Sequence, residues 1–546
     1  MRAIARTLLA TASALALTGV AAAASNEEIL QRLDAMQRTI EAQQAQIEAQ
    51  RAEIDSLKKR TQKRGAGPQS AADAGVPPPA PFESRVAALE AEAKRVRIAA
   101  KEQPSVSLVN GRPTIQSSDG RFSATIRGRL QFDLASYDQD SAGSQATDFR
   151  RGSVGTTANR EIVSARDLSD GGNFRRAQIG VEGKLAKDFG YRVVLEMGGS
   201  GTEGPSRLNE GWISYTGLAP FTFQVGAFSP PANLDDATSS DDTMFIERAS
   251  PAELSRALAG ADGRYAVGAR ANGERWFAAL HLTGGTFGDA ETFDEQRAVI
   301  ARVAGLAATG SDYNLHVGAN LSYVFKPADQ GPDVTARSPV RLRDRPELRV
   351  DSTRLIDTGS INADSVYAAG AELAGNWKNL NFQAEYFWYG VNRRDSTLSD
   401  PRFQGWYAEG SWIVTGEQKR YSMANASYAM PRPAATFQGS SGIGAVELAV
   451  RYSHTDLNYR EGAAGTLGAA DSIRGGEQDI WTLGANWYWN QNLRFTLGYQ
   501  FVDVDRLNPA RVGDLTPFGP SPATPPVGAE IGQSYRVLSL RSQVSF

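Results

Sequence analysis

The sequence has no cysteine, which excludes disulfide bonds and thiol chemistry from its fold and its function. Histidine is also rare: His281, His316 and His454 are the only three, and none lies at metal-pair spacing with another. No Gly-x-Ser-x-Gly nucleophile elbow is present, and the dinucleotide-like run at residues 199–204 is followed by Pro205 and a strand instead of a helix. The sequence therefore predicts no catalytic residues, no metal site and no cofactor, and we expect that the protein is not an enzyme.

Long hydrophobic runs and an excess of one charge are missing as well. Beyond residue 24, no stretch approaches the roughly 18 continuous apolar residues of a membrane-spanning helix. The net charge of −3 gives no general attraction to nucleic acid, which we therefore exclude as a partner. The first 24 residues do contain an apolar run, with Arg2 and Arg6 before it and three alanines after it. This order predicts a secretory signal peptide over residues 1–24.

The segment after the predicted signal peptide has a helical period. Its core positions recur in steps of three and four residues: Ile29, Leu33, Met36, Ile40, Gln43, Ile47, Gln50, Ile54 and Leu57. This seam predicts a coiled coil over residues 25–63, and the mixture of Ile and Gln in its core resembles trimeric seams. The alternative is one amphipathic helix lying on its own protein. A linker rich in Gly, Pro and Ala at residues 64–81 leads to a second short coil at residues 82–103.

From about residue 120 to the end, the sequence has a period of two. In the first clear strand the apolar positions are Phe122, Ala124, Ile126, Leu130, Phe132 and Leu134. In the last strand they are Leu538, Leu540, Val544 and Phe546, and they alternate with Ser539, Arg541, Gln543 and Ser545. Strands with one apolar and one polar face fit a barrel with lipid outside and a polar lumen inside. The modest hydrophobic share of 41% agrees, because such a barrel keeps its polar side chains in the lumen.

Short turns alternate with long polar segments along this part of the chain. Asn272-Gly273 and residues 490–492 form short turns, whereas the long segments are residues 138–172, 229–262, 326–365 and 506–534. Short turns at one rim and long loops at the other are typical of outer-membrane barrels. We therefore predict an all-β fold: a transmembrane antiparallel β-barrel of roughly sixteen strands over residues 120–546, embedded in the lipid of a Gram-negative outer membrane. The coiled coil would lie in the periplasm. A soluble propeller or set of sandwiches is the competing architecture, because half-buried strands also alternate.

Several short runs carry a family resemblance. In chain order they are Arg127-Gly128-Arg129-Leu130-Gln131, Phe174-Arg175-Arg176-Ala177, Gln224-Val225-Gly226-Ala227-Phe228, Thr238-Ser239-Ser240 leading to Ile246-Glu247-Arg248, Thr415-Gly416-Glu417, and Gly484-Ala485-Asn486-Trp487-Tyr488. With these runs the chain resembles the phosphate-selective porins O and P of Gram-negative outer membranes from about residue 120 to the end. The resemblance implies a sixteen-stranded homotrimeric porin whose basic lumen residues guide phosphate to a constriction.

The resemblance also implies which residues bind the anion. The positions that match the family's constriction are Arg129, Arg175, Arg176 and Arg248. The fifth loop holds a pattern similar to the family's entrance ladder, at Arg341, Arg343 and Arg345. Guanidinium groups replace the hydration shell of phosphate with paired charge-assisted hydrogen bonds, and several in sequence pass the ion along. We therefore expect a channel for phosphate, polyphosphate or other small anions.

Two departures from the family pattern favour a second interpretation. Asp236 stands in an acidic stretch where the family has a lysine, and Asn209 stands where the family has an aspartate. The alternative function is therefore a general or other-nutrient porin with weak ion selectivity, and a structural tether through the coiled coil is a third. A simpler interpretation of Arg127 and Arg129 is that they pair with lumen carboxylates such as Asp133. The corresponding simpler interpretation of residues 341–345 is a solvated loop without a role in anion binding.

Strand phase makes two further predictions. Arg175 alternates with Ala177 and Ile179 on the apolar side, so the pattern alone places only Arg176 in the lumen. His281 and His316 alternate with apolar neighbours and are expected to face the lumen as ordinary wall residues.

Overall fold

The computed structural model describes residues 91, 94, 103–139, 168–199, 207–287, 293–331, 337–437, 442–509 and 528–546. The chain divides into two compact units, residues 1–91 and 92–546, and nearly all described residues belong to the second. The predicted signal peptide, the coiled coil and the linker lie outside the described residues, as does almost all of the second short coil. Within the described part, no helix is long and apolar enough to cross a membrane.

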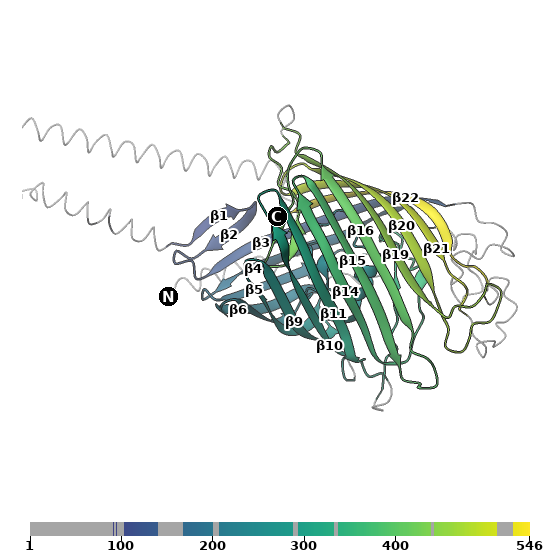
Figure 1. Cartoon of the computed structure of the whole chain (residues 1–546). Helices are drawn as coiled ribbons and strands as arrows, with labels where there is room; N and C mark the ends of the chain where they lie inside the picture. Colours follow the sequence, from purple (N-terminus) through teal and green to yellow (C-terminus); the bar gives the residue numbers. More distant parts are fainter. Residues whose placement is uncertain are drawn as a thin grey trace, which may run out of the picture. The chain divides into compact units, whose positions relative to one another are not determined.

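An antiparallel sheet dominates the second unit and closes on itself, because its last strand pairs with the first strand of the barrel (Figure 1). The described sheet has eighteen strands, and two of them form a hairpin beyond the cylinder, which leaves the sixteen barrel strands that the sequence predicts. The barrel strands are β3 (Ser123–Gln139), β4 (Gly171–Leu185), β5 (Phe189–Glu196), β6 (Arg207–Leu218), β7 (Phe221–Ala227), β8 (Arg264–Asn272), β9 (Trp276–Thr286), β10 (Arg297–Thr309), β11 (Tyr313–Lys326), β14 (Ala363–Trp377), β15 (Leu380–Arg393), β16 (Arg402–Ile413), β19 (Ala445–Tyr459), β20 (Ile473–Tyr488), β21 (Leu493–Asp505) and β22 (Gln533–Ser545). The hairpin consists of β1 (Ser105–Val109) and β2 (Arg112–Gln116).

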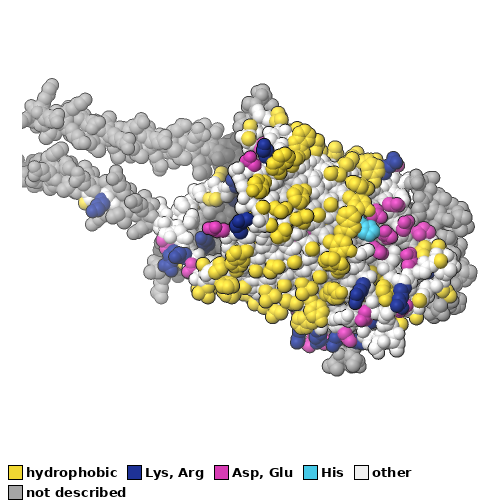
Figure 2. All heavy atoms as spheres, viewed as in Figure 1, with side chains coloured by type: hydrophobic (Ala, Val, Ile, Leu, Met, Phe, Trp, Pro, Cys, Tyr) yellow, Lys and Arg dark blue, Asp and Glu magenta, His cyan; other side chains and the backbone are white. Residues whose placement is uncertain are grey.

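The outer surface of the barrel is apolar because the alternating strands direct their apolar side chains outward. Ile126 and Leu130 on β3 and Leu538 and Leu540 on β22 are between 36% and 49% exposed. Figure 2 shows apolar side chains over the middle of this face and charged side chains toward its ends. An apolar band around a closed barrel is the lipid-facing surface of a membrane protein. It excludes a soluble propeller or sandwich.

In the part of the chain that the structure describes, three connections between barrel strands enter the lumen and make contact with its wall. Loop L3, residues 228–263, contains α4 (Leu234–Ala237) and α5 (Ser250–Ala259). Loop L5, residues 327–362, contains β12 (Arg343–Asp344) and β13 (Ile356–Asp357). The third connection joins β16 to β19 at the rim of the short turns, and we call these residues, 414–444, the inserted turn. It contains β17 (Arg420–Ser422) and β18 (Ser427–Ala429).

The main apolar core lies where L3 and L5 meet the inner wall. It includes Leu254 of α5, Leu348 and Ile356 of L5, and Phe387 and Ile480 of the wall, all at most 3% exposed. Helix α5 can lie close to the inner wall because residue 405 of β16 is glycine. A Cβ atom there would lie only 2.8 Å from Cβ of Pro251, so a larger residue would push the helix away. L3 and L5 thus occupy part of the barrel interior, and apolar packing against the inner wall holds them there.

Candidate functional site: the channel lumen

Loop L3 is held against the wall through its backbone. The Glu385 carboxylate on β15 accepts hydrogen bonds from the amides of Leu234 and Asp235, at 2.9 and 3.1 Å. Four strands further along the wall, Arg494 of β21 donates to the carbonyl oxygens of Asp241 and Thr243, at 3.1 and 2.6 Å. Charge-assisted bonds to a loop backbone satisfy groups that would otherwise be buried without partners. L3 is therefore a fixed part of the lumen.

A buried ionic cluster ties L3 to β4 and β22. Arg541 forms a bidentate pair with Asp133, at 2.6 and 2.7 Å, and also contacts Glu247 of L3 at 3.0 Å. Arg175 approaches the same Glu247 carboxylate at 2.7 Å. Burial alone would raise the pKa of Glu247, but the neighbouring guanidinium groups of Arg175 and Arg541 outweigh it and hold the pKa well below its usual value. The cluster stays ionised and anchors the loop.

The structure places the four predicted constriction arginines around L3, and L3 itself occupies most of their donors. Arg129 makes a bidentate pair with Asp241, with both contacts at 2.7 Å, and donates to Ser240 at 2.7 Å. Arg176 is 5% exposed and donates to Gln131 at 2.8 Å. Arg248 donates to the carbonyl oxygens of Asp235 and Thr238, at 3.1 and 3.0 Å.

The phase prediction for Arg175 was wrong. A β-bulge interrupts the β3–β4 register, where Gln131 pairs with Arg176 and the next residue, Phe132, pairs with Phe174. Arg175 is the extra residue of the bulge, and its side chain reaches Glu247 inside the barrel. The simpler interpretation predicted that Arg127 and Arg129 each pair with a lumen carboxylate, and both do. Their carboxylates are Glu182 and Asp241, whereas Asp133 pairs with Arg541.

The three arginines of the predicted entrance ladder differ in environment. Arg341 is exposed and pairs with Asp357, Arg343 is exposed, and Arg345 is only 3% exposed. Burial, with the guanidinium groups of Arg354 and Arg341 close by, lowers the pKa of Arg343. Arg343 is therefore accessible to solvent, whereas Arg345 is buried within L5.

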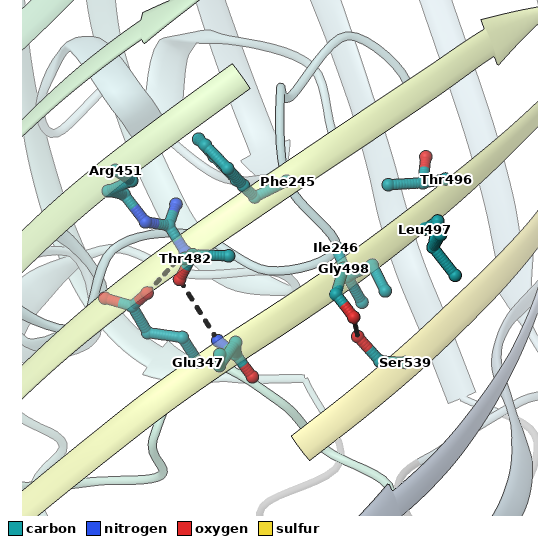
Figure 3. A pocket seen from close by; sticks show the side chains of 10 residues that line it. Phe245, Ile246, Glu347, Arg451, Thr482, Thr496, Leu497, Gly498 and Ser539 are labelled. Carbon is teal, nitrogen blue, oxygen red and sulfur yellow. Dashed lines mark hydrogen bonds and ion pairs between the residues drawn. The ribbon is translucent and has the colours of Figure 1, made fainter. Parts of the chain in front are cut away.

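Loop L5 also seals the wall formed by β19 to β22. Glu347 of L5 forms an ion pair with Arg451 of β19 (Figure 3). Glu347 also accepts a hydrogen bond from Ser453 at 2.6 Å. Beside this pair a cavity of about 10 Å³ remains, lined in part by Phe245 of L3 and by Thr482 and Ser539 of the wall. This volume holds about one water molecule.

The inserted turn was not expected from the sequence, since residues 414–444 were not among the predicted long segments. Arg302 of β10 makes a bidentate pair with Glu372 and donates to the carbonyl oxygens of Asn425 and Ala426, both at 2.8 Å. Ser427 reaches L3 through the carbonyl oxygen of Ala237 at 3.1 Å. The inserted turn and L3 thus meet inside the barrel. The alternation of residues along β10 is enough to place Arg302 in the lumen. The sequence does not indicate that Arg302 binds the inserted turn, because the two are more than a hundred residues apart.

On one side of the lumen, along β3 to β8, many lumen-facing side chains keep partial contact with solvent. We call it the open side, and it carries a network of charged side chains. Glu182 lies 3.2 Å from Arg127, 2.8 Å from Arg192 and 3.0 Å from Arg112. Arg192 also contacts Glu210 at 3.1 Å. The side chains of Arg192, Glu182 and Glu210 are 29%, 21% and 22% exposed, so solvent reaches them.

Two more side chains complete the open side. Arg270 of β8 donates to the side chain of Asn425, in the inserted turn, at 3.1 Å, and forms no ion pair within the described residues. Trp212 lies beneath Arg192, with the guanidinium 5.2 Å from its ring centre, and donates to Glu210 at 2.9 Å. Sequence reasoning missed Arg192 and Arg270, although both occupy lumen-facing positions of strands and strand phase could have found them.

The histidines follow the phase prediction and add one contact that it missed. His281 and His316 face the interior, are at most 1% exposed, and His316 contacts Tyr421 of the inserted turn at 2.7 Å. His454 lies outside the lumen, in register with Asp479 of the next strand. Its ring nitrogen is 3.0 Å from Asp479 and 3.8 Å from Glu477. Register across strands brings these three together, which spacing along the chain could not indicate.

A closed barrel with an apolar outside and a charged, partly open interior defines a porin-type channel. The family described as phosphate-selective porin O and P matches residues 158–523, more than half of the chain. The chain belongs to the phosphate-selective porin O and P family. It is therefore an outer-membrane porin of a Gram-negative bacterium, and family and fold point to a channel rather than an enzyme.

Two curated relatives and two solved structures illustrate the similarity. An uncharacterized protein from Caulobacter vibrioides is 28% identical over 484 residues, covering 84% of this chain and 84% of the relative. Porin O from Pseudomonas aeruginosa is 26% identical over 417 residues, covering 72% of this chain and 86% of the relative. An anion-selective porin from Comamonas acidovorans matches 78% of this chain and 100% of its own, with 11% identity and a TM-score of 0.45. The trimer form of OmpT from Vibrio cholerae matches 78% and 99%, with 10% identity and a TM-score of 0.42.

Proposed function

We propose that the protein is a channel for the passive, anion-preferring uptake of phosphate or polyphosphate through an arginine-lined lumen, and that it works as a homotrimer. The observation that carries the proposal is the composition of the open side. There, Arg127, Arg192 and Arg270 outnumber the carboxylates Glu182 and Glu210, and Arg112 of the hairpin adds a further positive charge beside Glu182. The excess positive charge lies on the only wall where described lumen side chains of several adjacent strands are in contact with solvent.

The arrangement suits an anion that is passed along and not held. Arg112, Arg127 and Arg192 share the single carboxylate Glu182, which leaves guanidinium donors of each free to turn toward a solute. Phosphate accepts paired hydrogen bonds from such groups, and these replace part of its hydration shell. Because Glu182 and Glu210 compete for the same donors, binding stays weak enough for release. At the entrance, Arg343 with Arg341 and Arg354 nearby adds a first positive site.

The constriction residues that the family resemblance implies take a smaller part in this proposal. Arg129 is paired with Asp241 and Arg175 with Glu247, so their charge is largely neutralised by L3. Arg176 and Arg248 contribute positive potential near the narrow part of the lumen. The acidic stretch that replaces the family's lysine is thus the feature that favours the second candidate, a general porin with weak ion selectivity.

Channel recordings in planar bilayers separate the two candidates. In a gradient of KCl, the anion-preferring channel gives a reversal potential of the sign set by chloride, and added phosphate reduces the chloride current. Arg192→Gln removes a charge from the open side and should weaken the block by phosphate several-fold. Arg402→Gln, at an exposed arginine where β16 begins, removes the same charge away from this path and serves as the control. A reversal potential near zero, or no response to phosphate, would establish the weakly selective porin.

A further inference from the structure

The hairpin of β1 and β2 extends the sheet beyond the closed cylinder (Figure 1). β2 pairs with the first residues of β3, from Thr114 opposite Thr125 to Gln116 opposite Ser123. β1 pairs with β2 and has no other partner strand among the described residues. The hairpin therefore ends in a free strand edge outside the barrel.

One face of this hairpin is apolar and unusually exposed. Val106 lies opposite Ile115 and Leu108 lies opposite Pro113, so these four side chains share a face. Val106 is 77% exposed and Leu108 is 74% exposed, whereas the large apolar side chains of the barrel surface reach at most 61% in the described part. Apolar side chains that stand this far into solvent mark an interaction surface.

The opposite face of the hairpin is already engaged by the barrel. Arg112 lies there and forms an ion pair with Glu182 at 3.0 Å. Thr114 lies there as well and shares a hydrogen bond of 3.0 Å with Thr125 of β3. These contacts fix the orientation of the hairpin. The apolar face and the free edge point away from the lumen.

The free edge also lacks the usual protection against pairing with other chains. Its sequence from Ser105 to Val109 is Ser-Val-Ser-Leu-Val, which contains no charged residue and no proline. Exposed edge strands of stable proteins normally carry one or the other, or are covered. An unprotected apolar edge is therefore expected to be covered in the assembled protein.

We propose that the apolar face of the hairpin, formed by Val106, Leu108, Pro113 and Ile115, packs against the same face of a second copy of this chain. The sequence just before the hairpin indicates that the partner is a second copy of the chain. The predicted second coil ends at residue 103, and β1 begins at Ser105. A parallel coiled coil holds equivalent residues of its chains at the same level, so it would deliver the hairpins of neighbouring copies to one place. Uncharged apolar faces then meet around the symmetry axis without repulsion.

Cysteine crosslinking of the full-length protein in membranes tests this interface, and the native chain has no cysteine to interfere. Leu108→Cys places a thiol on the apolar face, and Ser107→Cys places one on the opposite face of the same strand. Mild oxidation should join Leu108→Cys copies covalently in the majority of molecules and Ser107→Cys copies at least several-fold less. A water-soluble maleimide should label Ser107→Cys faster than Leu108→Cys.

Each other result contradicts the interface. Equal crosslinking at both positions would mean that the copies are near each other but that this face does not join them. Absence of crosslinks with free maleimide labelling at Leu108→Cys would mean that the face stays in water. Absence of crosslinks with protection from maleimide would identify lipid as the occupant. Folding of each variant is checked by the heat-dependent shift of the barrel in gel electrophoresis, which does not depend on the hairpin.

Discussion

The two sides of the lumen are built from the same kind of strand and differ in what covers them. On β15, β16 and β22, and on β19 as far as Leu457, the lumen-facing side chains are buried. On β5 to β8, lumen-facing side chains such as Arg192, Gln224 and Arg270 stay in partial contact with solvent. The solvent-accessible lumen side chains therefore lie on one side, and the path that we propose follows β3 to β8.

The difference also separates two uses of arginine. On the covered side, Arg451 and Arg541 are buried and each is matched by carboxylates of the wall and the loops. There they fix L3 and L5 in place. On the open side, Arg127 and Arg192 share carboxylates and Arg270 has only a neutral partner. The second group is therefore the one that we propose acts on a passing ion.

The largest effect is expected from Arg541→Met, which breaks the covered side. It leaves the buried carboxylate of Asp133 without its guanidinium partner, and it leaves Glu247 with Arg175 and without Arg541. Loss of one partner of a buried ion pair costs about 3–5 kcal/mol. L3 should detach, single-channel conductance should rise, and the unfolding temperature should fall. Arg536→Met, an exposed arginine of the same strand, is the control, and equal behaviour of the two variants would refute the anchoring role.

A smaller effect is expected from Arg270→Glu, which inverts one charge on the open side. The reversal potential in a KCl gradient should move toward cation preference, and more so at about 0.1 M salt, where charges act over about 10 Å, than at 1 M. Lys378→Glu makes the same change in the exposed turn after β14, away from the lumen. A shift of the same size in both variants would show that only the total charge of the protein matters.

The pH dependence of L5 is expected to be weaker still. Burial, with Glu253 close by, raises the pKa of Asp344 from its usual 3.8 to about 7. A carboxyl whose pKa is raised in the folded state stabilises the fold fully below its unfolded pKa, and this contribution is lost as the pH rises through 7. The unfolding temperature should therefore fall between pH 5 and pH 8, and less so in Asp344→Asn. An unchanged slope in this variant would assign the dependence to another group.

The smallest effect is expected from Tyr421→Phe, which removes the hydrogen bond between the inserted turn and His316. One such bond contributes about 1 kcal/mol. The inserted turn should move more freely, which appears as increased noise of the open-channel current with little change in its mean. Tyr386→Phe removes a comparable bond to Gln404 on the outer surface and should leave the noise unchanged. Noise that rises equally in both variants would count against the role of the inserted turn.

The barrel was predictable from the sequence because lipid and lumen impose a period of two on every strand, as in Phe122 to Leu134. The strand count and the lumen position of His281 and His316 follow from the same rule. The phase of Arg175 failed because a bulge shifts the register by one residue, and the pattern of apolar residues carries no sign of it. The division into an open and a covered side could not be read either. It depends on contacts such as Glu347 with Arg451, between residues about a hundred positions apart.

The most direct test of the proposed path compares two engineered cysteines, one on each side of the lumen. Gln224→Cys lies on the open side, and Thr482→Cys lies on the covered side, where the native residue is 3% exposed. A charged, water-soluble thiol reagent applied during recording should reduce the current through Gln224→Cys and leave Thr482→Cys unchanged. Loss of current in Thr482→Cys, with Gln224→Cys unaffected, would place the path on the opposite wall and contradict the account.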